Sequence, residues 1–169
     1  MKLTIPTENG FIDEHHGNQA QPADRYAGWP AVSIPMTFSD VPEDAKTLAW
    51  TLIDFDAVPV SGFAYIHWLG ANLPADQLSV PADASRHADG QFIQGRNSTA
   101  GRVVHATDPL TTQRYVGPMP PNGPHEYLVT GYALDTTLPL TEGYWLNEFR
   151  RAIDGHVVGY ATATFLAKP

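Results

Sequence analysis

The residues best suited to chemistry lie in two short stretches. The first spans residues 54–59, with the sequence Asp-Phe-Asp-Ala-Val-Pro, and directly follows an apolar run. Its two carboxylates are spaced by two, so both side chains point to the same side if extended backbone continues. Paired carboxylates repel each other unless water, backbone N–H groups or a nearby cation stabilise them. This spacing predicts a polar site at the end of a strand.

The second stretch spans residues 115–127, with the sequence Tyr-Val-Gly-Pro-Met-Pro-Pro-Asn-Gly-Pro-His-Glu-Tyr. Proline has no N–H, so Met119 is the only backbone donor between Pro118 and Pro121, in a segment that the proline rings hold stiff. A lone donor on a rigid segment suits an anion. His125 and Tyr127 begin the following strand and project to the same face, which adds an imidazole and a phenol.

His67, in another apolar run, is a third candidate. Taken alone, His67 and Asp54 are typical of buried polar residues that satisfy one another. Two histidines and two carboxylates could also bind zinc or iron, although aromatic and proline-rich surroundings suit an anion better. A hydrolase would need a nucleophile beside a histidine, and the only serines that can be nominated are Ser33, Ser61 and Ser98.

Motifs that would indicate a nucleotide fold or a serine hydrolase do not occur. The chain has no Gly-x-Gly-x-x-Gly, no Gly-x-x-x-x-Gly-Lys-Ser/Thr and no Gly-x-Ser-x-Gly string. Residues 125–129 contain half of a zinc-peptidase motif, but Val129 stands where the second histidine is needed. The sequence therefore predicts no catalytic residue, no metal ligand and no cofactor.

Four apolar segments must position these residues, and each is typical of a β-strand. They span residues 47–55, 63–73, 125–134 and 156–166. The first is almost continuously apolar, as in a strand covered on both faces, and the last alternates small or polar residues with larger ones. The 15 prolines and 14 glycines punctuate short segments throughout, so a mostly β domain is expected.

One helix is predicted over residues 141–155. Thr141 is the expected N-cap and Gly155 the expected C-cap, with Glu142 in the first turn and two arginines in the last. Residues 11–30 show neither helical nor strand periodicity and predict a long surface loop with a solvated His15-His16 pair. The apolar face of the helix comprises Trp145, Leu146, Phe149, Ala152 and Ile153.

Length and charge narrow the class of protein. A chain of 169 residues is the size of one domain, expected here over 1–169. The formal net charge of −8 argues against nucleic-acid binding and against tight docking on anionic lipid. The absence of cysteine excludes disulfides and thiolate catalysis. No segment resembles a signal peptide or a membrane span, so a cytoplasmic protein without integral membrane association is expected.

The order of these motifs resembles the phosphatidylethanolamine-binding protein family, in particular its bacterial Raf kinase inhibitor-like branch. Residues 33–38 resemble the family's Ser-Pro-Pro-Leu-x-Trp, residues 54–59 its Asp-Pro-Asp-Ala-Pro, and residues 67–74 its His-Trp-x-x-x-Asn-x-Pro. The most specific likeness is that of residues 115–127 to Tyr-x-Gly-Pro-x-Pro-Pro-x-Gly-x-His-Arg-Tyr. The Gly-His-Val at 155–157 also fits the family pattern.

This resemblance implies a Greek-key β-sandwich with a short C-terminal helix and few other helices, all small. It also implies a cavity that accepts phosphate-like anions and phospholipid headgroups without catalysis. Because family members restrain kinases or inhibit proteases, the expected partners are a small phosphorylated or anionic ligand, a kinase or protease, and a second copy of the chain. The residues that the resemblance places in the cavity are Asp54, Asp56, Tyr65, His67, Pro118, Met119, Pro120, His125 and Tyr127.

Three positions depart from the family pattern. Phe55 replaces a proline, Val58 is inserted before Pro59, and Glu126 stands where the family has arginine, which reverses a charge beside the cavity. Four arginines between residues 86 and 114 would compensate only if their loop folds towards the cavity, and otherwise belong to a solvated loop. They are Arg86, Arg96, Arg102 and Arg114.

Three functional expectations remain open at this point. Neighbouring carboxylates favour a charged imidazole, so His67 and His125 are expected to take up protons and to bind anions better as the pH falls. The alternative is a protein-interaction module whose cavity is vestigial. A metal-binding or hydrolytic site at His67, His125 and Asp54 is a further alternative.

Overall fold

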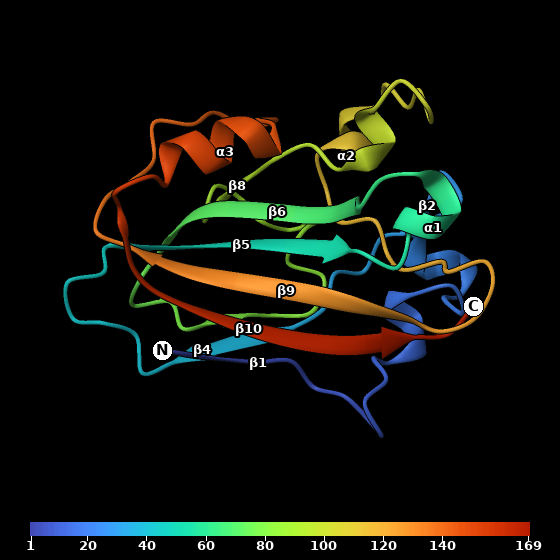
Figure 1. Ribbon diagram of the computed structural model, residues 1–169, viewed down its shortest axis with the longest axis horizontal. Coiled ribbons are helices and arrows are strands. Elements are labelled where there is room, and N and C mark those ends of the chain that lie inside the picture. Colours follow the sequence, from blue (N-terminus) through green and yellow to red (C-terminus); the bar gives the residue numbers. More distant parts are fainter.

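Strands from most of the chain form two antiparallel sheets that pack face to face (Figure 1). The computed structural model describes all residues, 1–169. These sheets confirm the predicted mostly β architecture. The large sheet has the order β10-β9-β5-β6-β8, with the respective bounds Val157–Ala167, His125–Leu134, Thr47–Asp54, Tyr65–Pro74 and Ile93–Gln94. The small sheet has the order β1-β4-β7, with the bounds Lys2–Thr4, Met36–Ser39 and Ser79–Val80.

The helices are few and short, and none has the length and hydropathy of a membrane-spanning segment. In Figure 1, α3 lies over the outer face of the large sheet near one end, whereas α1 and α2 lie towards the other end. The α-helices are α1 (Val58–Ser61), α2 (Pro109–Thr112) and α3 (Leu146–Ala152). The 3-10 turns are Glu14–His16, Pro22–Asp24 and Ser98–Ala100.

All four predicted strands are present, each beginning and ending within two residues of its predicted bounds. The continuous apolar run of β5 is explained by its central position between β6 and β9. Its side chains alternate between two apolar clusters: Trp50 belongs to the main core inside the sandwich, and Ala49 to a smaller cluster beneath α3. Both faces of this strand are therefore covered, as its sequence predicts.

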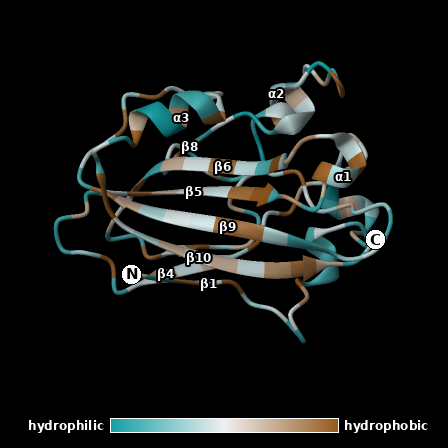
Figure 2. Ribbon diagram, viewed as in Figure 1, coloured by the Kyte–Doolittle hydropathy of each residue, from teal (hydrophilic) through white to brown (hydrophobic).

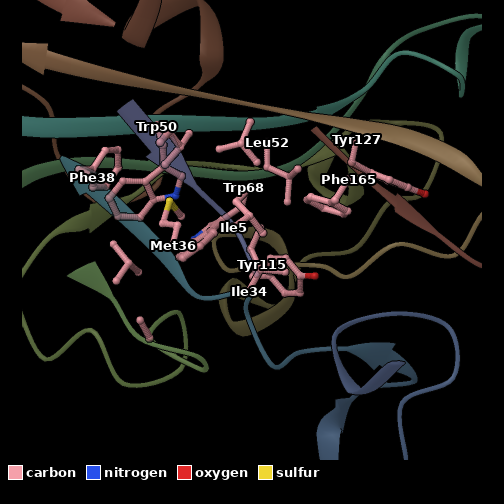
Figure 3. Packing of buried hydrophobic residues seen from close by; sticks show 14 of the residues in the cluster. Ile5, Ile34, Met36, Phe38, Trp50, Leu52, Trp68, Tyr115, Tyr127 and Phe165 are labelled. Carbon is pink, nitrogen blue, oxygen red and sulfur yellow. The ribbon is translucent and has the colours of Figure 1, made fainter. Parts of the chain in front are cut away.

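The main core is built around aromatic side chains from both sheets (Figure 3). Trp50 and Trp68 pack edge to face with their ring centroids 5.0 Å apart. Gly70 permits this packing, since a Cβ there would lie 2.2 Å from the Trp50 ring. At the opposite end of the cluster, Tyr127 stacks on Phe165. Figure 2 shows the hydrophobic colour continuing to the ends of β5 and β10, while α3 is largely hydrophilic on its exposed side.

The C-terminal helix is shorter than predicted. Helix α3 begins at Leu146 rather than after Thr141, because Gly143 adopts a left-handed conformation (φ 80°) that no α-helix contains. The first-turn acid is Glu148, whose carboxylate accepts from the backbone N–H of Trp145 (2.6 Å). Glu142 instead accepts from the backbone N–H of Gln94 (2.8 Å). The prediction of the helix was correct, but its caps are Trp145 and Ile153 rather than the predicted Thr141 and Gly155.

Residues 11–30 are more ordered than the predicted surface loop. They contain two 3-10 turns and a small hairpin of β2 (Arg25–Tyr26) and β3 (Trp29–Pro30). His16 is buried and bonds the carbonyl of Val32, so the expectation that both adjacent histidines are solvated was wrong. The Arg25 guanidinium donates to the carbonyl groups of residues 18, 20 and 28. Hydrogen bonds from one side chain to several backbone carbonyls do not produce a periodic sequence pattern. The order of this segment could therefore not be predicted from periodicity.

Candidate functional site

A cavity of about 240 Å³ lies where β5 ends and β6 and β9 begin. Asp54 is paired across the sheet with both Tyr65 and Tyr127, so the ends of these three strands meet at the cavity. Of the predicted site residues, all except Asp56 and Pro118 line it. The lining residues that sequence reasoning missed are Trp29, Ala57, Val60, Ser61, Val104, Val116, Gly117 and Pro121.

His67 reaches the cavity through an irregularity in β6. Ile66 pairs with Ile53 of β5, and the next ladder pair is Trp68 with Leu52, which leaves His67 as an extra residue without a partner. Such a β-bulge re-aims side chains and is frequent beside functional sites. It allows consecutive residues to serve different purposes: Trp68 packs in the main core while His67 lines the cavity.

Two hydrogen bonds tie His67 to Val116 in the proline-rich segment. The Val116 N–H donates to the carbonyl of His67 (3.1 Å), and the imidazole Nδ1 donates to the carbonyl of Val116 (2.6 Å). Burial lowers the pKa of His67 to about 4, although the Val116 carbonyl and Asp54 oppose this shift. The expected protonation of His67 in the physiological range was therefore wrong, since desolvation outweighs its carboxylate neighbour.

Asp54 and His125 form a buried pair beside the cavity. The His125 Nδ1 donates to one Asp54 oxygen (2.8 Å), and the other oxygen accepts from the backbone N–H of Ala57 (2.9 Å). The His125 Nε2 lies 3.0 Å from the side-chain oxygen of Asn122. The carboxylate is thus satisfied by partners on β9 and on the turn into α1, which explains how it is held at 4% exposure.

Asp56 lies apart from this pair. Because β5 ends at Asp54, the extended geometry that would align the two carboxylates does not continue, and residue 56 falls in a turn. Asp56 is exposed and accepts from the backbone N–H of Glu126 (2.9 Å). Pro118 is buried, and its carbonyl faces Gly17 rather than the cavity. The structure thus separates these two residues from the other predicted site residues.

Unpaired donors are present in the cavity lining. The hydroxyl of Tyr65 is buried without a hydrogen-bond partner, and burial raises the pKa of Tyr65 to about 12, which keeps this hydroxyl protonated. The backbone N–H of Met119 also has no acceptor within the protein. Burial, followed by the charge of Asp54, raises the pKa of Tyr127 well above its ordinary value. Donors without acceptors in the lining of a small cavity favour a ligand rich in acceptor atoms.

The four arginines of the 86–114 interval do not line the cavity. Arg86 pairs with Asp83, Arg114 pairs with Glu142, and Arg96 donates to the carbonyl of Gly143 and lies over the ring of Trp145. The structure brings the guanidinium of Arg25 close to a residue of the cavity lining, with its Nη1 3.9 Å from the sulfur of Met119. No local pattern around Arg25 indicates this position.

The three nominated serine hydroxyls are not arranged as nucleophiles. Ser61 lines the cavity, but its hydroxyl lies within bonding distance of the carbonyls of Ala57 and Phe63. The Ser33 hydroxyl accepts from the backbone of Ser85, and that of Ser98 from the backbone of Ile66. None of the three hydroxyls bonds an imidazole. The structure contains no cluster of three or more His, Asp or Glu side chains that could hold a metal ion.

Comparison with known protein families identifies the family of this chain. The family model described as phosphatidylethanolamine-binding protein matches residues 4–168. The chain is 39% identical over 160 residues to the uncharacterised Bacillus subtilis protein YxkA, covering 95% of each chain. It is 37% identical to a UPF0098 protein of Methanothermobacter thermautotrophicus, covering 77% of this chain and 78% of the relative.

Solved structures of similar proteins have the same fold. A phosphatidylethanolamine-binding protein homologue from Chlamydia trachomatis superposes with a TM-score of 0.77 at 28% identity, covering 99% of this chain and 97% of the other. YBCL from E. coli, described as a member of the mammalian family, superposes with a TM-score of 0.75 at 22% identity, covering 99% and 98%. The second likeness concerns the fold alone.

Proposed function

Because the chain belongs to the phosphatidylethanolamine-binding protein family, we propose that its cavity binds a small anionic group, such as a phosphate ester, without catalysing a reaction. The observation that carries this proposal is the unpaired hydroxyl of Tyr65: the residue lines the cavity, and its hydroxyl is buried without a hydrogen-bond partner. A buried donor without an acceptor destabilises the protein, and a hydrogen bond to an oxygen of a bound anion would remove this cost. The Met119 N–H, on its proline-stiffened segment, supplies a second donor.

Tyr65→Phe is expected to weaken anion binding by roughly tenfold to hundredfold. A hydrogen bond to a charged group contributes about 1.5 to 3 kcal/mol, and about 1.4 kcal/mol corresponds to tenfold in affinity. The substitution breaks no internal bond, because the hydroxyl makes none. Methyl phosphate and dimethyl phosphate are suitable probes, followed by the amide NMR shifts of Met119 and Tyr127.

The matched control is Tyr160→Phe, which removes a hydroxyl from an exposed tyrosine on β10 and should leave binding unchanged. The proposal fails if neither ester shifts the amides of Met119 and Tyr127 in the wild-type protein. It also fails if both esters bind Tyr65→Phe as tightly as they bind the wild type.

The absence of catalysis is proposed from the hydroxyl groups near the cavity. The Ser61 hydroxyl faces two carbonyl oxygens and no base, so nothing is placed to accept its proton during an attack. The purified protein is therefore expected to show no esterase, phosphatase or peptidase turnover above background. Turnover that disappears in His125→Ala would contradict this expectation.

A second candidate function is favoured by the side chains around the cavity mouth. Val60 and Val104 line the cavity and are partly exposed, and Val103, next to Val104 in the chain, is 78% exposed. Exposed apolar side chains gathered around one site are typical of an interaction surface. A kinase or protease that binds the wild type and His125→Ala equally, but does not bind Val103→Asp, would identify this surface as the functional one.

A further inference from the structure

The hydrogen bonds of His67 determine which of its nitrogens carries a proton. The carbonyl of Val116 can only accept, so Nδ1, 2.6 Å away, must be the N–H donor. Burial keeps the ring neutral near pH 7. In a neutral imidazole with a proton on Nδ1, the other nitrogen, Nε2, carries a lone pair and is an acceptor. Nε2 has no hydrogen-bond partner within the protein, and the side chain is 95% buried beside the cavity.

His67 therefore adds an unpaired acceptor to a cavity lining that also contains two unpaired donors. The Tyr65 hydroxyl and the Met119 N–H are both donors that an oxygen of the ligand could accept from. An oxygen without a proton would face the Nε2 lone pair unfavourably, whereas a hydroxyl would satisfy it. The complementary ligand thus carries acceptors and at least one donor within a space of about 240 Å³.

We propose that the cavity selects phosphate monoesters in their singly protonated form, with the ligand's P–OH group donating to Nε2 of His67. This inference rests on the proposed anion-binding function and specifies its ligand. A monoester monoanion has one hydroxyl and two unprotonated oxygens on the same phosphorus atom, so it provides both kinds of group at once. A phosphodiester has no proton to donate at neutral pH. The complex holds one proton between the ligand oxygen and Nε2.

The charged and titratable groups facing His67 are consistent with a singly charged ligand. Asp54 on β5 contributes a carboxylate, which accepts a hydrogen bond from His125 on β9. Tyr65 on β6 and Tyr127 on β9 have raised pKa values and remain neutral phenols. Val116 and Met119, from the proline-rich segment, bring only backbone groups and a thioether. A dianion would meet the Asp54 carboxylate with one more negative charge than a monoanion, which is unfavourable in a buried site.

The test compares methyl phosphate with dimethyl phosphate in the wild-type protein at pH 5.5 and pH 8. At pH 5.5 the monoester is expected to bind about tenfold to hundredfold more tightly, because it alone can donate to Nε2. Its second pKa is about 6, so at pH 8 only about 1% is singly protonated and its affinity should fall by about a hundredfold. The affinity of dimethyl phosphate should not fall for this reason, because the diester has no proton to lose between pH 5.5 and pH 8.

His67→Asn is the matched variant, since its amide can still donate to the Val116 carbonyl but places no atom where Nε2 lies. It should lose the preference for the monoester. The ring ¹⁵N shifts of the free wild-type protein should show Nδ1 protonated and Nε2 unprotonated. The opposite tautomer, or equal and equally pH-dependent binding of the two esters, would overturn this inference and leave the proposed function standing. Failure of both esters to bind would remove the proposed function itself.

Discussion

Acidification from pH 7 to pH 4 is expected to lower the free energy of unfolding by about 3 kcal/mol through His67 alone. The folded protein holds the pKa of His67 at about 4, below the ordinary value of 6.5, so the unfolded chain binds a proton in this window that the folded chain does not. Stability is therefore complete above pH 6.5 and decreases as the pH falls towards 4. Burial lowers the pKa of His16 too, which acts in the same direction.

Urea unfolding at a series of pH values measures this effect, with His67→Asn as the comparison. The variant removes one titrating imidazole, so its stability should fall less steeply between pH 6.5 and 4 than that of the wild type. Parallel curves for the two proteins would mean that folding does not lower the pKa of His67. That result would also contradict the neutral imidazole on which the preference for monoesters at pH 5.5 depends.

Phe149→Ala is expected to destabilise the protein by about 3 to 5 kcal/mol, the usual cost of truncating a buried phenylalanine. Phe149 is fully buried and holds α3 on the outer face of the large sheet. Its ring centroid lies 5.7 Å from that of Tyr132 and 6.1 Å from that of Tyr144. No other side chain of α3 is fully buried, so the docking of the helix depends on this residue.

The denaturant midpoint of unfolding measures this loss, and Asn147→Ala is its control. Asn147 is exposed on the same helix, and its replacement by alanine should change stability by about 0.5 kcal/mol at most. A midpoint that is unchanged in Phe149→Ala would mean that α3 is not docked on the sheet in solution.

The strands were the part of the fold most accessible to sequence reasoning. Continuous or alternating apolar patterns, such as that of Thr47–Asp54, report burial directly, and burial decides where strands form. The site was accessible because its residues are concentrated at strand ends: Asp54 ends β5, and His125 begins β9. Motif order and periodicity together thus place seven of the nine predicted site residues in the cavity lining, and miss eight further lining residues.

The incorrect predictions concern residues whose local backbone geometry or packing differs from what the sequence pattern indicates. Asp56 leaves the cavity because β5 stops two residues before it, and the helix starts late because Gly143 adopts a positive φ. The charge state of His67 depends on desolvation and on a carbonyl 49 residues away. No residue pattern contains that information, since it arises only when the proline-rich segment packs against β6.

The bulge in β6 makes His67 a supernumerary residue of the sheet. With Ile66 opposite Ile53 and Trp68 opposite Leu52, excision of His67 would join these two pairs into a regular ladder and leave every neighbour on its own face. The sheet does not need this imidazole, but the cavity does. Insertion or deletion of one residue in β6 would therefore add or remove this acceptor without changing the fold. Relatives whose β6 is one residue shorter should retain the sandwich but should not prefer protonated ligands.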